Sequence, residues 1–496
     1  MTGRRAAGIR GRVSLYLAGV LLLLGAWSGA SALAGAFIIP PPWQTLVDTL
    51  VLLGRGFTWP QVLITVARVL VGFLAALLAG AAVGILSGLR PGLEAFFRPA
   101  VLFLQGIPPL LWAIPLILLL GIGHLSPILV IALICFPLVA TNLAEGMKSL
   151  PRSLAEMLDV FAPGFRARLR ELIFPHLKPF LTAALRLGIV LGIKASVIAE
   201  YFGANDGIGF QIQSAYQTLQ MRRLFAWALL LVALILAANE LLARLEELSR
   251  RGRVRRLKAF EPLKVGAGVE RLKRSFRDTV ATGGIHLEGV GFAYPGAEPV
   301  LSEISLAVAS REIAVISGDS GIGKTTLLHL IASLREPTVG TVRRPGRLGL
   351  VFQDDRLLPW RSNAWNVALP LVYSGTPLEE ALAFARFLLA EAGLEGMEWG
   401  LPDELSGGMK KRLAFARCFA RFPDGILLDE PFTGLDAEAR RLLWGKFTDL
   451  LALRRVPAVI VTHFPEEVPC SEACRYYRLE ASRQARQPAR LVAVQT

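Results

Sequence analysis

The sequence predicts two parts, an all-α part with six membrane-spanning helices and an α/β part that follows it. Long apolar runs separated by short polar gaps fill roughly the first 250 residues. From about residue 285, short β-type apolar runs alternate with helical patterns instead. The chain of 496 residues is 53% hydrophobic and only 19% charged, which is too apolar for one soluble protein and indicates a membrane part.

Six apolar runs are long enough, or nearly so, to cross a bilayer, which takes about 17 to 25 residues. They cover residues 13–35, 62–86, 100–120, 126–138, 185–202 and 224–242. The fourth is short and contains Pro137, and the third contains Pro108, Pro109 and Pro115, so we expect the third to be bent or broken. Because such breaks survive in a membrane only where other helices or water satisfy the freed backbone groups, they favour a packed bundle lining a path.

The positive charges predict the orientation of these spans. Arginine and lysine gather before residue 13 and at residues 90–98, 148–178 and 250–258. The positive-inside rule places these four segments, and therefore both termini, in the cytoplasm, with Arg222 and Arg223 as exceptions on the outer side. The net charge of +15 then reflects mostly membrane orientation, and no nucleic-acid partner is expected.

The first run also resembles a cleavable signal peptide, because a basic start precedes it and "ASALAGA" ends it. We expect an uncleaved first span instead. Its removal would leave five spans and put the two ends of the chain on opposite sides of the membrane. The four cysteines are expected to be reduced, since Cys470 and Cys474 form a lone C-x3-C without a second ligand pair.

These patterns divide the chain into a membrane domain at residues 1–250, a basic cytoplasmic linker at 251–283 and an α/β domain at 284–496. The predicted strands of the last domain are "AVISG", "LGLVF", "GILLD" and "AVIVTH". Strands that alternate with helices are typical of a nucleotide-binding domain.

A P-loop follows the first of these strands. "GDSGIGKT" matches G-x-x-x-x-G-K-T at residues 318–325, in the required order of strand, loop and helix. Its backbone N–H groups are expected to wrap a polyphosphate, Lys324 to reach the β- and γ-phosphates, and the Thr325 hydroxyl to bind Mg²⁺. The predicted nucleotide-binding residues here are Gly318, Asp319, Ser320, Gly321, Ile322, Gly323, Lys324, Thr325 and Thr326.

An acidic pair ends another apolar strand in "GILLDEP". Asp429 is predicted to hold the magnesium ion, and Glu430 to orient or deprotonate the attacking water. An acidic pair alone is usually a solvated strand end, but an apolar strand before it and a P-loop upstream favour the catalytic interpretation.

With these residues in place, 284–470 resembles the ATPase domain of ABC transporters. The resemblance assigns Tyr294 to adenine stacking, Gln353 to sensing Mg²⁺ and the attacking water, and His463 to the γ-phosphate. Asp436 in "GLD" matches the D-loop. Glu430, His463 and Gln353 are then the expected catalytic residues, and Thr325, Gln353 and Asp429 the expected metal ligands.

The stretch "LSGGMKKR" resembles the ABC signature. In that family Ser406 and the amides of Gly407 and Gly408 would contact ATP held by the P-loop of a second copy. The motif is therefore half of a site, and the resemblance implies a homodimer with two complete sites. Met409 stands where the family usually has glutamine, so we expect altered contacts there but not inactivity.

The membrane domain resembles the permeases of type I importers. "EMLDVFAPGFRARLRELIFPHLKPFLTAALRLGI" is similar to their cytoplasmic EAA loop, placed here near 156–176, whose short helix docks on the ATPase. Met157, Leu158 and Ala162 depart from the usual pattern. "IPPLLWAIPLILLLGIG" and "IAEYFGANDGIGF" resemble permeases of the nitrate, sulfonate, taurine and bicarbonate group.

The resemblance implies a permease fused to its ATPase in the bacterial plasma membrane. Such a chain uses ATP and Mg²⁺ to import a small solute, which arrives on an extracytoplasmic binding protein. The alternatives are an exporter half-transporter, which typically has longer cytoplasmic helices and no EAA-like loop, and an ABC ATPase that drives a membrane complex without moving solute. The sequence does not name the solute.

Lys194 lies inside the fifth predicted span. A charge at that depth is costly and usually faces a partner or a pathway. One interpretation is structural, with Lys194 paired to Glu200 or reaching toward the membrane surface. The other places Lys194 on the substrate path, where it attracts an anionic solute.

Overall fold

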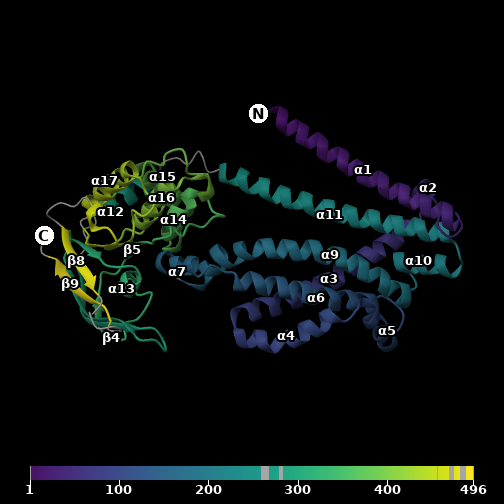
Figure 1. Cartoon of the computed structure of the whole chain (residues 1–496), viewed down its shortest axis with the longest axis horizontal. Coiled ribbons are helices and arrows are strands. Elements are labelled where there is room, and N and C mark those ends of the chain that lie inside the picture. The colour runs from purple at the N-terminus through teal and green to yellow at the C-terminus, as the bar shows by residue number, and fades with distance from the viewer. Residues whose placement is uncertain are drawn as a thin grey trace. The chain divides into compact units, whose positions relative to one another are not determined.

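The computed structural model describes residues 2–162, 164–258, 267–278, 283–454, 456–468, 474–480 and 488–494. The chain forms two compact units (Figure 1). We call Met1–Leu150 with His176–Arg251 the membrane unit, and Pro151–Pro175 with Gly252–Thr496 the ATPase unit, after what the sequence predicts for each. The predicted linker at 251–283 lies partly outside the described residues.

Long apolar helices make up the membrane unit. They are α1 (Thr2–Ala34), α2 (Pro42–Leu53), α3 (Thr58–Leu89), α4 (Pro91–Gly106), α5 (Pro109–Leu120), α6 (Leu125–Lys148), α9 (Phe174–Gly203), α10 (Ile208–Gln217) and α11 (Met221–Lys258). Among the described residues, five helical stretches are long and apolar enough to span a membrane, and α4 with α5 makes a sixth when the bent pair counts as one span. The prediction of six spans agrees with this upper count.

The third predicted span is broken, as its prolines indicate. Helices α4 and α5 meet at an angle of 96°. Pro108 and Pro109 have no N–H, so the carbonyls one turn earlier lose their helical donors. The fourth span differs from the prediction, because α6 continues for 24 residues to Lys148. Its polar second half stays helical, and Asn142 donates a side-chain bond to the Leu138 carbonyl at 2.8 Å.

Helices α3 and α6 pack in close contact within the membrane unit. Gly72, Gly80, Gly84 and Gly88 recur on one face of α3, at a spacing that is a multiple of four residues. A Cβ added at Gly84 would lie 2.5 Å from the Ala140 carbonyl oxygen, so the helices approach backbone to backbone. Small residues permit such contact where hydrophobic burial gives no net drive for helix association.

A buried polar cluster joins α3, α9 and the start of α10. Arg68 donates to Glu200 at 3.1 Å, and it also bonds to His124 and Asp206. Glu200 is fully buried and accepts further bonds from Thr65 at 2.9 Å and from the Gly209 amide at 3.0 Å. Buried charges in a membrane require this kind of pairing.

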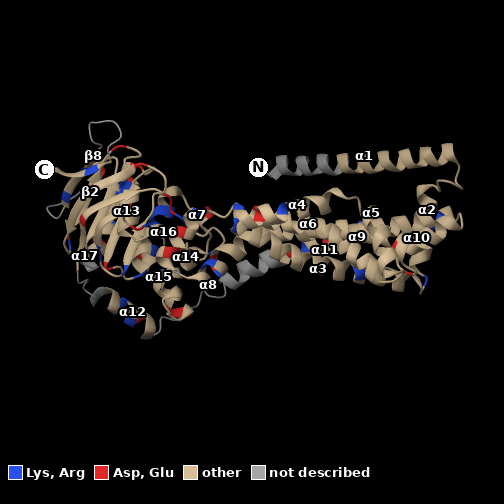
Figure 2. Cartoon of the chain, turned by 90° about the horizontal axis from the view of Figure 1, so that it is seen from below, with Lys and Arg blue, Asp and Glu red and all other residues tan. Residues whose placement is uncertain are grey.

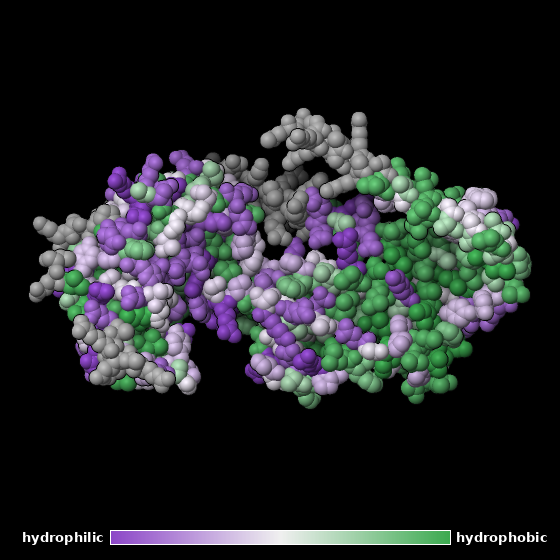
Figure 3. Space-filling view, in the orientation of Figure 1, coloured by the Kyte–Doolittle hydropathy of each residue, from purple (hydrophilic) through white to green (hydrophobic). Residues whose placement is uncertain are grey.

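The two units differ in surface chemistry. Charged residues are sparse along the helices of the membrane unit (Figure 2), and the face in Figure 3 is largely hydrophobic over that unit and largely hydrophilic over the ATPase unit. A surface that is apolar around a helical bundle suits hydrocarbon as its solvent.

The described residues of the ATPase unit form two sheets. Its strands are β1 (Ile285–Ala293), β2 (Pro299–Val308), β3 (Ile313–Ser317), β4 (Val339–Arg343), β5 (Leu348–Val351), β6 (Gly425–Asp429), β7 (Ala458–Thr462), β8 (Cys474–Glu480) and β9 (Arg490–Val494). The order β2-β1-β4 makes an antiparallel sheet, and β5-β6-β7-β3-β8-β9 makes a sheet that is parallel except for β8–β9. The four predicted strands are β3, β5, β6 and β7, and their apolar composition fits strands buried on both faces.

Helices complete this unit. They are α7 (Arg152–Phe161), α8 (Phe165–Ala167), a π-helical turn (Arg168–Ile173), α12 (Ala267–Asp278), α13 (Lys324–Ile331), α14 (Asn363–Tyr373), α15 (Leu378–Glu391), α16 (Gly407–Ala420) and α17 (Ala437–Arg454). Short 3-10 turns lie at Pro402–Glu404 and Pro465–Glu467. We call Pro151–Pro175 the coupling segment, since it lies between two membrane helices in sequence but packs in the ATPase unit.

The cysteines differ from expectation at one position. Cys135 and Cys418 are free and buried. Cys474 is disulfide-bonded, so the prediction of reduced thiols is wrong there. The C-x3-C spacing alone does not predict that strand β8 positions Cys474 for a disulfide bond.

The α3–α6 contact predicts a difference between two glycine substitutions. Gly84→Leu should destabilise the membrane unit by about 1–3 kcal/mol, because overpacking forces helices apart. Gly25→Leu on α1 is the control, since a Cβ there has nothing within 4 Å. Thermal melts in detergent, followed by tryptophan fluorescence, should show a lower midpoint for Gly84→Leu alone. Equal midpoints for the two variants would contradict the close approach.

Candidate active site

The carboxyl edge of the parallel sheet collects the predicted site residues. Strands β5, β6, β7 and β3 are neighbours in that order, with Val351 opposite Leu428, Asp429 opposite Val461 and Ser317 opposite Thr462. Gln353, Glu430, His463 and the P-loop all follow directly after these strand ends. Parallel pairing therefore brings together residues that are up to 145 positions apart in sequence, at the edge where α/β proteins bind ligands.

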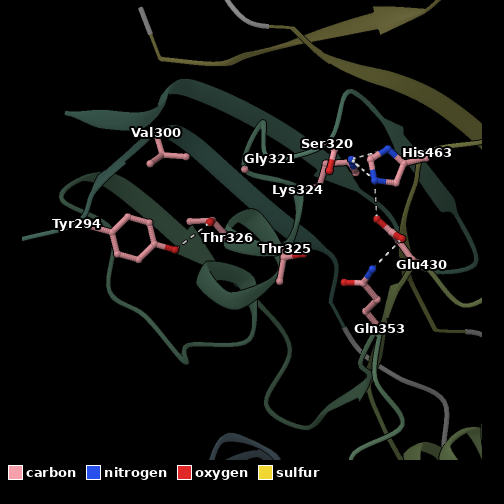
Figure 4. Close-up of a pocket in the computed structure, with 11 residues that line it drawn as sticks. Tyr294, Val300, Ser320, Gly321, Lys324, Thr325, Thr326, Gln353, Glu430 and His463 are labelled. Carbon is pink, nitrogen blue, oxygen red and sulfur yellow. Dashed lines mark hydrogen bonds and ion pairs between the residues drawn. The ribbon is translucent and has the colours of Figure 1, made fainter. Parts of the chain in front are cut away.

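A pocket of about 320 Å³ opens at this edge (Figure 4). It is lined by Tyr294, Val300, Ser320, Gly321, Gly323, Lys324, Thr325, Thr326, Gln353, Glu430 and His463. Gly321 and Gly323 have φ angles of +77° and +109°, in the region that favours glycine. The loop thus curves with its amides at the N-terminus of α13, which is a suitable cradle for phosphate.

Lys324 lies across this loop. Its ammonium donates to the carbonyls of Gly318 at 2.8 Å and Asp319 at 2.9 Å, and it lies 3.3 Å from a ring nitrogen of His463. Burial lowers the pKa of Lys324, while the nearby Glu430 and Asp429 raise it. The arrangement places a cation at the centre of the glycine-rich loop.

Thr325 and Asp429 form a pair that fits a magnesium ion. The Thr325 hydroxyl donates to Asp429 Oδ1 at 3.3 Å. Burial raises the pKa of Asp429 to about 6, and the hydrogen bond from Thr325 lowers it in part. A hydroxyl and a carboxylate, completed by phosphate oxygens and water, are a donor set that Mg²⁺ accepts.

Three predicted catalytic side chains meet directly. Glu430 accepts from Gln353 Nε2 at 3.1 Å and pairs with His463 Nε2 at 2.8 Å (Figure 4). Glu430 also has a φ of +45°, which is uncommon for a residue with a side chain. Its amide donates to the Val461 carbonyl at 2.9 Å, so the sheet holds the backbone in that conformation. The carboxylate thereby points into the pocket beside the P-loop.

Tyr294 lines the same pocket, with its hydroxyl 3.2 Å from Thr326 Oγ1. Sequence reasoning missed its neighbour Arg335, whose guanidinium lies 4.7 Å from the centre of the Tyr294 ring. It also missed Val300, an apolar wall of the pocket. No motif marks either residue, because each reaches the site through packing alone.

The signature residues lie elsewhere. Ser406, Gly407 and Gly408 are not among the residues that line the pocket. Ser406 caps α16 by accepting a bond from the Met409 amide at 3.4 Å, and a Cβ at Gly407 would meet nothing within 4 Å. Met409 packs against the hydrophobic core. Asp436 is also outside the pocket lining and accepts from the Ala439 amide at 2.7 Å, near the start of α17.

The coupling segment brings a buried acid that sequence reasoning did not select. Glu171 is fully buried and accepts bonds from Arg361, Trp365 and Tyr373. Burial first, and then the neighbouring Glu171, raise the pKa of Tyr373, so the phenol stays a donor. The sequence signal that could have identified Glu171 is that it is an acidic residue in an otherwise basic and apolar stretch.

Lys194 is exposed on α9 of the single chain. Glu200 bonds to Arg68, Thr65, Ser196 and the Gly209 amide. The pair between Lys194 and Glu200, which was one interpretation of Lys194, does not form. Other groups therefore already bond to the Glu200 carboxylate, and the sequence alone does not show that they lie beside it.

Two family descriptions match the chain. "ABC transporter" matches residues 301–433, and "Binding-protein-dependent transport system inner membrane component" matches residues 77–251. Together they account for a P-loop half and a membrane half in one chain.

Two relatives in sequence support the first match. The taurine import ATP-binding protein TauB of Pseudomonas putida is 41% identical over 192 residues, covering 37% of this chain and 73% of that protein. The aliphatic sulfonates import ATP-binding protein SsuB 3 of Paraburkholderia xenovorans is 42% identical over 172 residues, covering 35% of this chain and 68% of that protein. A solved dimeric structure of a bacterial ABC transporter cassette is 30% identical, covers 39% of this chain and 93% of that one, and has a TM-score of 0.36.

The contacts of Glu430 generate a prediction for ATP turnover. Glu430→Gln should retain nucleotide binding and lose about 10²- to 10⁴-fold in the hydrolysis rate, because an amide cannot accept the proton of the attacking water. Glu395→Gln, at an exposed position, should turn over ATP like the unsubstituted chain. Steady-state phosphate release and binding of a fluorescent ATP analogue measure the two effects. Turnover near the normal rate would exclude Glu430 as the water-activating residue.

Proposed function

Since the chain belongs to the ABC transporter family and carries a binding-protein-dependent membrane component ahead of its ATPase, we propose that it imports a small solute across the bacterial plasma membrane. Its ATPase part hydrolyses ATP, and this hydrolysis is coupled to transport. The observation that carries the direction of transport is the coupling segment. It resembles the EAA loop of importer permeases and packs in the ATPase unit.

The working form in this proposal is a homodimer. One chain supplies one P-loop and one signature, and the signature residues do not line the chain's own pocket. A second copy would complete each site, with Ser406, Gly407 and Gly408 against ATP on the partner's P-loop. The N-terminus of α16 then meets the γ-phosphate, an anion that a helix N-terminus favours.

Hydrolysis in each site relies on positioning and charge. Mg²⁺ would be held by Thr325 and Asp429, with Gln353 near the ion and the attacking water. Glu430 orients or deprotonates that water, and Lys324 and His463 stabilise the charge on the phosphate. Tyr294 stacks on adenine. ATP closes the two ATPase units, and hydrolysis resets them.

The solute proposed is a small organic anion or zwitterion. The relatives' names point to taurine and aliphatic sulfonates as the first compounds to test. Lys194 supports an anionic group, because it carries a charge inside a membrane-spanning helix and makes no hydrogen bond or ion pair with the described residues. A charge at such depth favours a polar path over lipid.

The membrane topology proposed has both termini in the cytoplasm. Arginine and lysine gather in alternate loops, as the positive-inside rule requires. Of the outer-side exceptions, Arg222 bonds to Asp48 at 2.8 Å and Arg223 to Gln211 at 2.8 Å, so both charges are satisfied locally.

The import proposal predicts ATPase stimulation by a loaded binding protein. The chain in lipid nanodiscs, mixed with a purified extracytoplasmic binding protein that binds taurine or ethanesulfonate, should hydrolyse ATP faster when that solute is present. The Glu430→Gln chain is the control and should not respond. ATP-driven efflux from vesicles without any binding protein would instead indicate an exporter. ATPase activity that changes only with a non-transport membrane partner would indicate the third alternative.

Mixed dimers test the shared site. A dimer of one Lys324→Ala chain and one Ser406→Arg chain should keep one intact site, because both lesions fall where the altered P-loop meets the altered signature. Both substitutions in one chain, paired with an unsubstituted chain, should damage both sites. ATP occupancy of purified, differently tagged dimers should therefore be higher in the first combination. Equal occupancy, or the reverse order, would show that Ser406 does not serve the partner's nucleotide.

A further inference from the structure

A small pocket in the membrane unit contains three arginines that have no part in the proposed import mechanism. We call it the arginine pocket. Its volume is about 220 Å³, and its lining residues are Asp48, Val51, Leu52, Arg55, Gln220, Arg222, Arg223 and Ala226. It therefore lies between α2, the turn that follows α2 and the start of α11. Arg222 and Arg223 are also the exceptions to the positive-inside rule, so orientation does not explain their charge.

The three arginines are not equally neutralised. Arg222 forms two bonds to the Asp48 carboxylate, at 2.8 and 2.9 Å. Arg223 donates to the uncharged amide of Gln211 at 2.8 Å, and its Nε is buried without a hydrogen-bond partner among the described residues. Arg55 is exposed and makes no hydrogen bond or ion pair with the part of the chain that the structure describes. Three arginines and one aspartate thus leave two positive charges in the pocket.

Helix α2, which forms one wall of this pocket, exposes an apolar face. The residues of this face are each more than half exposed and are Trp43, Leu46, Val47, Leu50 and Val51. Their spacing of three and four positions puts them on one side of the helix. The opposite side carries Thr45 and Thr49, which are buried, and the Thr49 hydroxyl donates to the Ala226 carbonyl on α11 at 3.3 Å. A helix that exposes apolar side chains and buries hydroxyl groups suits hydrocarbon as its neighbour.

The spans beside the arginine pocket are also the least buried among the described helices. The most apolar stretches of α1 and α11 are 6% and 17% buried, against 33% to 44% for those of the other three long spans. The end of α1, α2 and the start of α11 lie at the same end of the membrane unit (Figure 1). Trp43 and the exposed Trp59 flank the turn that contains Arg55, and tryptophan is enriched at the depth of lipid headgroups. The surroundings of the pocket are therefore those of a membrane interface.

We propose that the arginine pocket binds the phosphodiester headgroup of an anionic phospholipid such as phosphatidylglycerol. Arg55 and Arg223 provide the uncompensated charge, and a guanidinium can bind two phosphate oxygens with parallel N–H donors. The acyl chains lie along the exposed apolar face of α2. The proposed topology places this lipid in the outer leaflet, but its binding does not depend on transport.

Two other occupants would be attracted by the same arginines. One is an acidic surface of an extracytoplasmic binding protein, and the other is a free organic anion from solution. Neither accounts for the apolar face of α2, because both would leave that face in water. Of the three occupants, a phospholipid is the one that brings an anionic group and hydrocarbon together.

Native mass spectrometry of the full chain in detergent tests the proposal. The probes are phosphatidylglycerol and phosphatidylcholine with the same acyl chains, and the soluble anions glycerol phosphate and ethanesulfonate. The variants are Arg55→Gln, Arg55→Lys and Asp48→Asn. Arg90→Gln is the matched control, because Arg90 is an exposed arginine at the end of α3 that does not line the pocket.

The parent chain should bind its first phosphatidylglycerol at least about tenfold more tightly than phosphatidylcholine. Arg55→Gln should weaken phosphatidylglycerol binding about fivefold, whereas Arg55→Lys and Arg90→Gln should stay within about twofold of the parent. Asp48→Asn should tighten phosphatidylglycerol binding about fivefold, because it removes the negative charge from the lining and releases Arg222. A substitution that only disturbed folding would weaken binding instead, so the opposite signs separate the two causes.

Equal affinity for the two lipids, equal losses in Arg55→Gln and Arg90→Gln, or weaker binding in Asp48→Asn would overturn the lipid site. Glycerol phosphate or ethanesulfonate binding as tightly as phosphatidylglycerol would indicate a site for soluble anions instead. In nanodiscs of phosphatidylcholine alone, Arg55→Gln should still be stimulated by the loaded binding protein. Loss of that stimulation with unchanged lipid binding would assign the arginines to the binding protein. Selective lipid binding by a parent chain that does not transport would contradict the import proposal alone.

Discussion

Parallel pairing of β5, β6, β7 and β3 is the constraint on which the rest of the active site depends. Each strand is fully buried or nearly so, and its register with its neighbour sets how far the next loop projects. Glu430 shows the effect most directly. Its strained φ is held by a bond to the Val461 carbonyl, so the sheet supplies the force that keeps the carboxylate in the pocket. Gln353 and His463 then reach it from the two flanking strands.

The signature residues do not share this sheet edge. The P-loop and the acidic residues share the sheet edge, but the signature begins α16 at another place, with Ser406 occupied in capping its own helix. Met409 is consistent with this arrangement, since it packs on the core rather than lining the nucleotide pocket. Met409 therefore contributes to packing in this chain, and a Cβ added at Gly407 would meet nothing within 4 Å.

Helix packing in the membrane unit has a different physical basis. Hydrophobic burial cannot drive helices together in lipid, so packing and polar pairing must do so. Glycines on α3 permit backbone contact with α6, and the Arg68–Glu200 pair fastens α9 to α3. The coupling segment instead packs in the ATPase unit, where Glu171 is buried among hydrogen-bond donors. The donors around Glu171, which are Arg361, Trp365 and Tyr373, satisfy the charge of this carboxylate. Hydrocarbon would not satisfy it.

The sequence by itself determined the class of each half and most of the residues that line the pocket at the sheet edge. Apolar run lengths predicted the spans, the prolines predicted the break between α4 and α5, and the P-loop, "GILLDEP" and "IVTHF" identified residues that the structure brings into one pocket. These signals are local, because each depends on neighbouring residues and on the period of one strand or helix. Tertiary structure alone decided the rest. Arg335 beside Tyr294, the Glu200 pair with Arg68 in place of Lys194, and the cage around Glu171 join residues that are 41, 132 and 190 or more positions apart. No local pattern encodes such contacts, since they arise only when packing and the need to satisfy buried charges select one partner among many.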